Sequence, residues 1–476
     1  MAIISSSIAT KFSHGLVERR RENHPSEHFG SLFFFFCSDF IHSSTRKLAL
    51  SPTQALTVCS VSKPKLNHCL YPSSSSSSSS STMEEEHVTS SDEEEKYGRE
   101  LDIAIRAVQM ACALCRNLQH TLNSTSTNYL RANSEEDISP LTIAGYSVQA
   151  TVSWVLSQSL GSRSSVSILT EEDAAMDMDR HLSESLVKTV NECLGQAPRF
   201  GLKGPETALG TPEVLQALRR CTSSPTPSGT FWALVPVDGT LGFLQGDQYA
   251  VSLALIEEGE VVVGVLGCPN YPMKKEWLSY QQGYRSILAR LSSASAHASE
   301  NGWDDKGCVV YAKKGGGKAW VQPLLHGNKK MKSARAARVN SSIDDLESAT
   351  FCVPVENANW CHSFTAGLAH SLGLRKQPIC LNSMVRYAAI ANGDAEVLMK
   401  FGRGGGQKER LWDHAAGVII IQESGGVVTD TGGSPLNFSK AAHLEEVDRG
   451  IIASAGQKLH DKVITAVDAS WFSSCL

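Results

Sequence analysis

The chain lacks the features of a membrane protein, a disulfide-framework protein and a nucleic-acid-binding protein. Its aromatic run Phe33 to Phe36 is far shorter than the roughly 20 apolar residues that a membrane-spanning helix needs. The 13 cysteines have no framework spacing and are odd in number, which favours reduced thiols and predicts neither a disulfide nor a zinc site. With a net charge of -5 and a pI near 6.3, the chain offers no basic field to DNA or RNA. We therefore expect a soluble intracellular protein that binds no membrane and no nucleic acid polymer.

The composition divides the chain into an extension and a long folded part. Residues 1–82 are rich in Ser, contain basic residues and few acids, and resemble an organellar transit peptide; a disordered tail or a misassigned gene start is the alternative. An acidic linker, 83–96, begins at Met83. The remainder exceeds one ordinary domain, and we expect an amino-terminal α+β domain at 97–335 and a carboxy-terminal α/β domain at 336–476.

The first folded element is predicted to be a helix. Its apolar stripe runs from Leu101 to Cys115 at the helical period. Cys112 and Cys115 both fall on this stripe, so their C-x-x-C spacing indicates core packing and not a redox motif. Further helices are predicted over Val148–Leu160, from an N-cap at Thr211 to about Arg220, and through His362 to Leu372.

Antiparallel strands are predicted for the middle of the chain. The segments Phe231–Val235, Tyr249–Ile256 and Glu260–Leu266 are predicted to be strands, with Glu258-Gly259 as a hairpin turn. A second hairpin is predicted around Gly315-Gly316-Gly317; Lys318 follows, but the P-loop spacing is absent. The other predictions are strands at Val166–Leu169, Cys308–Ala312, Ala319–Pro323 and Thr350–Val355, and surface insertions at 286–306 and 325–347.

Three short acidic clusters stand where predicted strands end. They are Thr170-Glu171-Glu172-Asp173, Pro236-Val237-Asp238-Gly239-Thr240 and Trp412-Asp413-His414. Carboxylates from distant segments are what Mg²⁺ requires, and paired metals stabilise both the attacking and the leaving oxygen of a phosphoryl group. Each acid could instead be a turn or cap residue, and for Asp413 a helix N-cap is nearly as good an explanation. Only the combination of the three clusters argues for a metal site.

That combination resembles a known family, the lithium-sensitive phosphatases that include inositol monophosphatase, fructose bisphosphatase and the 3'(2'),5'-bisphosphate nucleotidases. The family signature D-P-I-D-G-T is similar to Val235 through Thr240, and W-D-x-x-A-G is present as Trp412 to Gly417. The stretches Gly242–Ala250 and Gly267–Asn270 resemble the nucleotidase branch, and the likeness extends from about residue 97 to 472. It implies a five-layer αβαβα sandwich with a metal site between two domains, an amino-terminal metal-binding domain and a carboxy-terminal nucleotide-binding domain.

The resemblance implies a site with two or three Mg²⁺ ions. Glu171, the carbonyl of Val237, Asp238 and Asp413 match metal ligands, and Glu172 matches a second acid beside them. Thr240 matches the hydroxyl that orients the attacking water. In such a site positioning and the metal charges carry most of the catalysis.

The resemblance also implies where a nucleotide would bind. The substrate positions of the family fall on Gly239, Thr240, Glu356, Asn382, Ser383, Arg386, Tyr387, Lys400 and Asp413. Arg386 and Lys400 would supply positive charge for a phosphate that does not react. Tyr387 is explained equally well as a core residue.

Two positions depart from the family pattern. Val235 replaces the Asp that bridges both metals, and valine has no oxygen to give. Gly145 stands in Ser139-Pro140-Leu141-Thr142-Ile143-Ala144-Gly145, where an acid would pair with Thr240 to activate water; Asp137 or Glu136 are possible substitutes. The loss of a shared anionic ligand weakens both metal sites.

Three functions follow from these residues. The first is a Mg²⁺-dependent nucleotidase that converts 3'-phosphoadenosine 5'-phosphate to AMP, and also the corresponding phosphosulfate to adenosine 5'-phosphosulfate, in sulfur assimilation. The second is a degenerate homologue that binds nucleotide or a partner chain without turnover. The third is an inositol phosphate phosphatase. We expect a monomer or homodimer located in the mitochondrion or, alternatively, the chloroplast.

Overall fold

The structure is a computed structural model that describes most of the chain after residue 95. The described residues are 96–129, 140–161, 166–171, 178–223, 229–272, 306–325, 333–354, 364–382, 384–401, 409–439, 442–444, 447 and 449–474. All of them belong to one compact unit, Glu84–Leu476, and the other unit is Met1–Met83. The predicted transit peptide and residues 83–95 of the predicted linker therefore lie outside the described residues, as does nearly all of the predicted insertion at 286–306.

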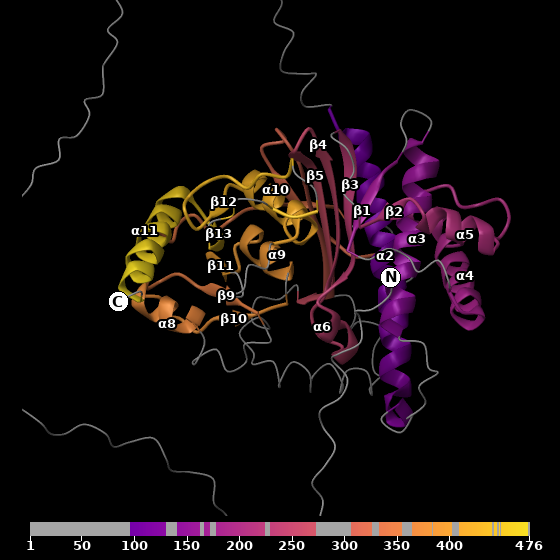
Figure 1. The fold of residues 1–476 in the computed structure, drawn as a ribbon, viewed down its shortest axis with the longest axis horizontal. Helices are drawn as coiled ribbons and strands as arrows, with labels where there is room; N and C mark the ends of the chain where they lie inside the picture. Colours follow the sequence, from indigo (N-terminus) through magenta and orange to yellow (C-terminus); the bar gives the residue numbers. More distant parts are fainter. Residues whose placement is uncertain are drawn as a thin grey trace, which may run out of the picture. The chain divides into compact units, whose positions relative to one another are not determined.

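The larger sheet has eight strands in the order β2-β1-β3-β4-β5-β6-β7-β8 (Figure 1). The strands β1, β2 and β3 pair in parallel and all later neighbours pair antiparallel, which confirms the prediction of antiparallel strands. Glu258 and Gly259 take φ of 50° and 81° between β4 and β5, as a tight hairpin turn requires. The strands are β1 Ile168–Thr170, β2 Cys221–Thr222, β3 Thr230–Asp238, β4 Ala250–Glu257, β5 Glu260–Pro272, β6 Lys306–Lys313, β7 Ala319–Pro323 and β8 Arg335–Ala337.

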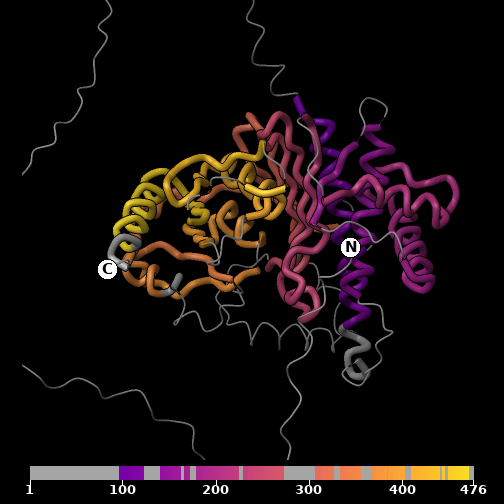
Figure 2. The backbone as a smooth tube through the Cα atoms, in the orientation of Figure 1, coloured from indigo at the N-terminus to yellow at the C-terminus, as the bar shows by residue number. Residues whose placement is uncertain are grey.

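A second sheet is built from the carboxy-terminal part of the chain. Its five strands are ordered β10-β9-β11-β13-β12, with parallel pairing on one side of β11 and antiparallel pairing on the other. The strands are β9 Phe351–Val353, β10 Ile379–Cys380, β11 Val397–Phe401, β12 Val427–Asp430 and β13 Gly450–Ser454. In Figure 2 this part of the tube, from orange to yellow, lies against the magenta strands of the larger sheet.

Helices cover both faces of each sheet. One hydrophobic cluster joins the amino-terminal helices to the larger sheet, a second joins both sheets to α9 and α10 between them, and a third joins the smaller sheet to α8 and α11. The helices are α2 Gly98–Tyr129, α3 Pro140–Leu160, α4 Arg180–Leu194, α5 Thr211–Leu218, α6 Thr240–Gln245, α8 Phe364–Ser371, α9 Val385–Ala391, α10 Ala415–Glu423 and α11 Gln457–Ser474, with 3-10 turns at Ala197–Phe200 and Leu411–Asp413. Three interleaved cores give five layers, so the expected αβαβα sandwich is confirmed.

Strand β5 shows how closely these layers pack. A Cβ added to Gly264 would lie 2.4 Å from Ile419 Cγ2 of α10, and one added to Gly267 would lie 2.3 Å from Cys112 Sγ of α2. Residues 264 and 267 point to opposite faces because side chains alternate along a strand. The helices α2 and α10 therefore reach the backbone of β5 from its two sides.

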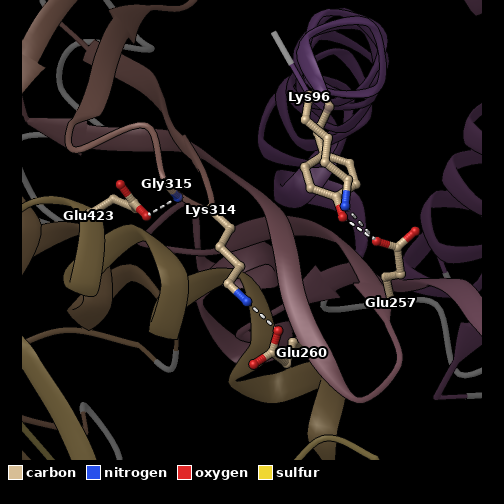
Figure 3. A network of polar contacts seen from close by, with 7 residues as sticks. Lys96, Glu257, Glu260, Lys314, Gly315 and Glu423 are labelled. Atoms are coloured by element: carbon tan, nitrogen blue, oxygen red, sulfur yellow. Dashed lines mark hydrogen bonds and ion pairs between the residues drawn. The ribbon is translucent and has the colours of Figure 1, made fainter. Parts of the chain in front are cut away.

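Polar contacts at one end of the sheet hold the hairpin turns to the helices (Figure 3). Lys96 Nζ lies 3.5 Å from Glu257 Oε2 at the end of β4, and Tyr97 also donates to that carboxylate. The amide of Gly315 donates to Glu423 Oε1, at the end of α10, over 2.8 Å. These groups are exposed or only partly buried, so each ion pair contributes little, at most about 1 kcal/mol.

The local predictions differ from the structure at a few positions. Thr211 is the first residue of α5 and not its N-cap, which is Gly210. The expected strand Thr350–Val355 contains β9 over Phe351–Val353, and the expected helix from His362 is described from Phe364. Cys112 and Cys115 are fully buried on α2, as predicted, and burial raises the pKa of both thiols. Within the described ranges, no helix is long and apolar enough to cross a membrane.

Candidate active site

The turn after β3 places two predicted site residues at one edge of the larger sheet. The pairing of β3 with β4 shifts register between Val235 and Asp238, and Gly239 then takes φ +89° before α6 begins at Thr240. The Asp238 carboxylate accepts a hydrogen bond from the amide of Met384 over 2.6 Å. Thr240 is exposed at the start of α6. The turn is thus bonded to the segment that leads into α9.

Glu171 comes from the parallel neighbour of β3. It follows β1 directly, and the register pairs Thr170 with Leu234 of β3. Parallel strands end at the same edge of a sheet, so Glu171 and the Asp238 turn share that edge. The Glu171 carboxylate lies 3.8 Å from Arg410 Nη1, just before the Asp413 turn.

Asp413 completes the group of described acids. It ends the 3-10 turn Leu411–Asp413, while the N-cap of α10 is His414, so Asp413 is not the helix cap that was its alternative explanation. Burial and, to a smaller extent, the negative charges of Asp238, Glu171 and Glu409 raise the pKa of Asp413 to about 7, against the opposing effect of Lys400. Carboxylates from distant segments thus contribute to this shift beside the larger effect of burial.

A second polar group lies beside Asp413. Glu409 Oε2 accepts from Lys400 Nζ over 2.6 Å and from His414 Nε2 over 3.2 Å. Burial would raise the pKa of Glu409, but the hydrogen bond from His414 and the charge of Lys400 outweigh it and lower the pKa to about 2. Burial, together with Lys400, lowers the pKa of His414 to about 4. Glu409 is therefore a carboxylate and His414 a neutral imidazole near pH 7.

Three polar groups surround the ring nitrogens of His414. Nε2 lies 3.2 Å from Glu409 Oε2, which only accepts, and 3.3 Å from Lys400 Nζ, which only donates, so these two neighbours favour opposite tautomers. Nδ1 lies 2.7 Å from Tyr387 Oη, a hydroxyl that can donate or accept. Tyr387 is 2% exposed and its ring packs where a Cβ at Gly417 would lie, 2.3 Å from Tyr387 Cγ. The phenol thus orients His414 from within the core.

The other predicted positions have different surroundings. Asn382 is buried and donates Nδ2 to the carbonyl of Gln248 over 2.6 Å. Arg386 is buried on α9, where its charge lowers the pKa of the Tyr387 phenol against the larger effect of burial. Glu172, Glu356 and Ser383 lie outside the described residues.

The two departures from the family pattern have clear surroundings. Val235 is 2% exposed and packs in the cluster that contains Tyr387 and Trp412. Gly145 lies in α3, which contacts α6, and a Cβ added to Gly145 would meet no atom within 4 Å. The valine therefore fills its space with methyl groups, whereas the glycine leaves room for a longer side chain.

The predicted donors are of the type that a hard cation binds, but too few of them lie close together. All of the predicted donors are oxygens: the carboxylates of Asp238, Asp413 and Glu171 and the Val237 carbonyl. The neighbouring negative charges raise the pKa of Asp413, and a bound cation would offset this repulsion. Among the described residues, however, no three His, Cys, Asp or Glu side chains are gathered closely enough to hold a metal ion. A shared carboxylate at position 235 is the donor that this set lacks.

Two participants were not among the predicted residues. His414 stands inside the W-D-x-x-A-G motif, so the motif pointed to its position but not to its role. Glu409 had no signal in the sequence, because only the fold brings it against Lys400.

Comparison with known proteins identifies the class to which this fold and site belong. The profile of the Inositol monophosphatase family matches residues 137–471, and the chain belongs to that family. Among curated relatives, "3',5'-bisphosphate nucleotidase AHL" of Arabidopsis thaliana is 51% identical over 79% of this chain and 98% of its own length. "3'(2'),5'-bisphosphate nucleotidase 1" of the same plant is 36% identical over 69% of this chain and 84% of its own length. The resemblance to the nucleotidase branch is thereby confirmed.

Solved structures of the family resemble the chain more distantly. An inositol monophosphatase from Anabaena (Nostoc) is 17% identical, with a TM-score of 0.42 over 78% of this chain and 95% of its own. An inositol monophosphatase from Thermotoga maritima is 17% identical, with a TM-score of 0.41 over 78% of this chain and 97% of its own.

Proposed function

We propose that this chain is a Mg²⁺-dependent phosphatase that removes the 3'-phosphate of 3'-phosphoadenosine 5'-phosphate to give AMP. The corresponding phosphosulfate is a second substrate, which would give the enzyme a role in sulfur assimilation. The observation that carries the proposal is that Glu171, Asp238 and Asp413, from three distant segments, lie near enough for the first two and Lys400 to act on the pKa of Asp413. Support also comes from the 51% identity to a relative named as a 3',5'-bisphosphate nucleotidase.

Glu171, Asp238, Asp413 and the Val237 carbonyl would hold Mg²⁺, with Glu172 as a further acid. When bound, Mg²⁺ supplies Lewis-acid charge and lowers the pKa of a bound water. Hydrolysis forms a bond from a water oxygen to phosphorus and breaks the bond from phosphorus to O3', which takes up a proton. Thr240, exposed at the start of α6, would orient that water through its hydroxyl.

The nucleotide would bind on the side of α9 and β11. The family pattern assigns Lys400 to substrate; its charge lowers the pKa of Asp413, and its Nζ is paired with Glu409 at 2.6 Å. A phosphate dianion would therefore compete with Glu409 for Lys400. Arg386, which is buried on α9, would contribute to the same pocket, and the family pattern adds Ser383.

A degenerate homologue that binds nucleotide without turnover is the second candidate. The observation that favours it is the packing of Val235, 2% exposed among apolar neighbours where the family has a bridging Asp. Inositol monophosphate is the third candidate substrate, because carboxylates and Mg²⁺ do not distinguish one alcohol from another.

The test is phosphate release from 3'-phosphoadenosine 5'-phosphate by the full chain, titrated with Mg²⁺ and repeated with Li⁺ and with inositol monophosphate. We expect release that requires Mg²⁺, is inhibited by Li⁺ and is faster with the nucleotide. Asp413→Asn should lower the rate by about 100-fold, because it removes a ligand charge. Nucleotide binding without release would establish the degenerate homologue, and faster release from inositol monophosphate would establish the third candidate.

A further inference from the structure

Hydrogen bonds from side-chain amides connect helix α2 to α6 and to the end of β5. Gln119 on α2 donates Nε2 to the carbonyl of Phe243 in α6 over 2.8 Å. Its Oε1 accepts from Asn270 Nδ2, near the end of β5, over 2.9 Å. The same Asn270 nitrogen donates to the carbonyl of Asp247 over 2.7 Å, just after α6. Two side chains therefore bond α6 and the residues after it to α2 and β5.

The chain of bonds continues to the segment before α9. Gln248 donates Nε2 to the carbonyl of Asn270 over 2.5 Å, and its own carbonyl accepts from Asn382 Nδ2 over 2.6 Å. Two residues after Asn382, the amide of Met384 donates to Asp238. Asp238 leads through Gly239 back into α6. The bonds and the covalent chain thus form a closed ring around the Asp238 turn and α6.

The first turn of α6 packs closely against two residues of this ring. A Cβ added to Gly242 would lie 1.9 Å from the Gln248 carbonyl oxygen and 2.2 Å from Asn382 Nδ2. At Gly239, with φ +89°, an added Cβ would lie 3.1 Å from Asn382 Cβ. The first turn of α6 therefore rests directly on Gln248 and Asn382, and only glycine permits this approach.

Burial of the amide side chains makes the loss of any of their hydrogen bonds costly in free energy. Gln119, Gln248 and Asn382 are 6%, 4% and 3% exposed. A buried amide that loses its partner stays unsatisfied, because water does not replace the missing bond. All of the side chains in the ring except Asp238 are neutral, so pH does not alter their bonds.

We propose that Gln119, Asn270, Gln248 and Asn382 form an amide clasp that sets the position of the Asp238–Thr240 turn against the segment before α9. These four are positioning residues, since they act through the backbone that carries Asp238 and Thr240. The amide nitrogen of Asn382, a position that the resemblance assigns to substrate, donates to the Gln248 carbonyl. The kinetic consequence rests on the proposed phosphatase function, whereas the clasp itself does not.

Hydrogen–deuterium exchange of the full chain tests the clasp without any activity measurement. Gln119→Met keeps the size of the side chain and removes both of its bonds. We expect the amides of residues 239–246 to exchange about 10-fold faster, while those of α11 keep their wild-type rates. Gln158→Met is the matched control, because Gln158 is exposed on α3. Unchanged exchange at 239–246 would overturn the proposal.

A milder variant separates local loosening from general unfolding. Asn270→Ala, at a partly exposed position, removes the donor to Gln119 and Asp247 without burying a charge. If Gln119→Met accelerates exchange throughout the chain, Asn270→Ala should still accelerate it at 239–246 alone. Acceleration spread evenly over the chain in both variants would contradict a positioning role.

Kinetics show what the clasp does for the reaction. With 3'-phosphoadenosine 5'-phosphate and saturating Mg²⁺, Gln119→Met should lower kcat by about 10- to 100-fold and change KM by less than about threefold, because it misplaces reacting groups. Faster local exchange with an unchanged kcat would refute the positioning role. If the wild-type chain releases no phosphate, the proposed function fails, and the exchange experiment alone decides the clasp.

Discussion

At the residue scale, positions 235 and 145 affect the site in different ways. Val235 is buried in an apolar cluster, so an acid there must be stabilised by a cation to be tolerated. A Cβ at Gly145 meets open space, so an acid there costs little packing. In the proposed mechanism, metal binding would depend on the first position and the activation of water by Thr240 on the second.

Restoring both acids should raise the phosphatase rate. For the double variant Val235→Asp, Gly145→Asp we expect kcat/KM for 3'-phosphoadenosine 5'-phosphate to rise by about 10- to 100-fold, because the bridging ligand and the base are regained. Mg²⁺ titration should show half-maximal activity at a lower concentration. Val235→Asn is the control that restores oxygen without charge.

The result would be contradicted if the double variant folds, as judged by circular dichroism, and gains no activity. In that case other parts of the site have also lost their geometry. A gain in Gly145→Asp alone would place the missing function in water activation and not in metal binding.

Gly417 allows a second prediction at the residue scale. Its Cβ would lie 2.3 Å from Cγ of the Tyr387 ring, which is 2% exposed, so the ring or the helix must shift to accept it. Gly417→Ala should therefore lower the free energy of unfolding by about 1–3 kcal/mol despite the better helix propensity of alanine. Urea denaturation measures the change. Gly367→Ala in α8, where an added Cβ meets nothing within 4 Å, should be neutral or stabilising.

At the element scale, α11 is held to the smaller sheet by a buried histidine. His460 Nε2 lies 2.9 Å from Thr429 Oγ1 of β12, and Nδ1 lies 3.2 Å from Ser454 Oγ of β13. Burial lowers the pKa of His460 from its usual 6.5, and the charge of Asp461 opposes this shift only in part. The neutral imidazole is therefore the form that the folded protein favours.

This pKa predicts how stability changes with pH. A histidine whose pKa is lower in the folded state binds protons more readily when unfolded, so its contribution is complete above pH 6.5 and decreases as pH falls below that value. Between pH 7 and pH 5, the wild-type chain should lose more unfolding free energy than His460→Gln, which does not titrate. Equal losses in urea titrations at the two pH values would contradict this role of His460.

Elements with a clear period were predictable from the sequence, and those held by distant contacts were not. The helix with the Leu101–Cys115 stripe and the hairpin around Glu258 follow from local patterns, because side-chain period and turn chemistry determine them. The two-residue strand β10 exists only through its pairing with β9 and was not predicted. The order of the acids was visible from motifs, but the bond from Asn382 to Gln248 joins residues 134 positions apart, which no local pattern reveals.

At the scale of the whole molecule, the active site depends on both sheets. Asp238 and Glu171 come from the edge of the larger sheet, Lys400 from the smaller one, and Asp413 from the turn that leads into the helix between them. The hydrophobic cluster that joins both sheets to α9 and α10 therefore supports all of these positions. Substitutions deep in that cluster should change catalysis as well as stability.

The division of the chain near Met83 allows the final prediction. Every described strand, helix and hydrophobic cluster lies within Glu84–Leu476, and residues 1–82 have the composition of an organellar transit peptide. A protein that starts at Met83 should unfold at the same urea midpoint as the full chain and release phosphate at the same rate.

Isolated mitochondria, or alternatively chloroplasts, should import and shorten the full chain but not the protein that starts at Met83. A lower midpoint for the shortened protein would show that the extension belongs to the fold, and import of both proteins would contradict its role as a targeting segment.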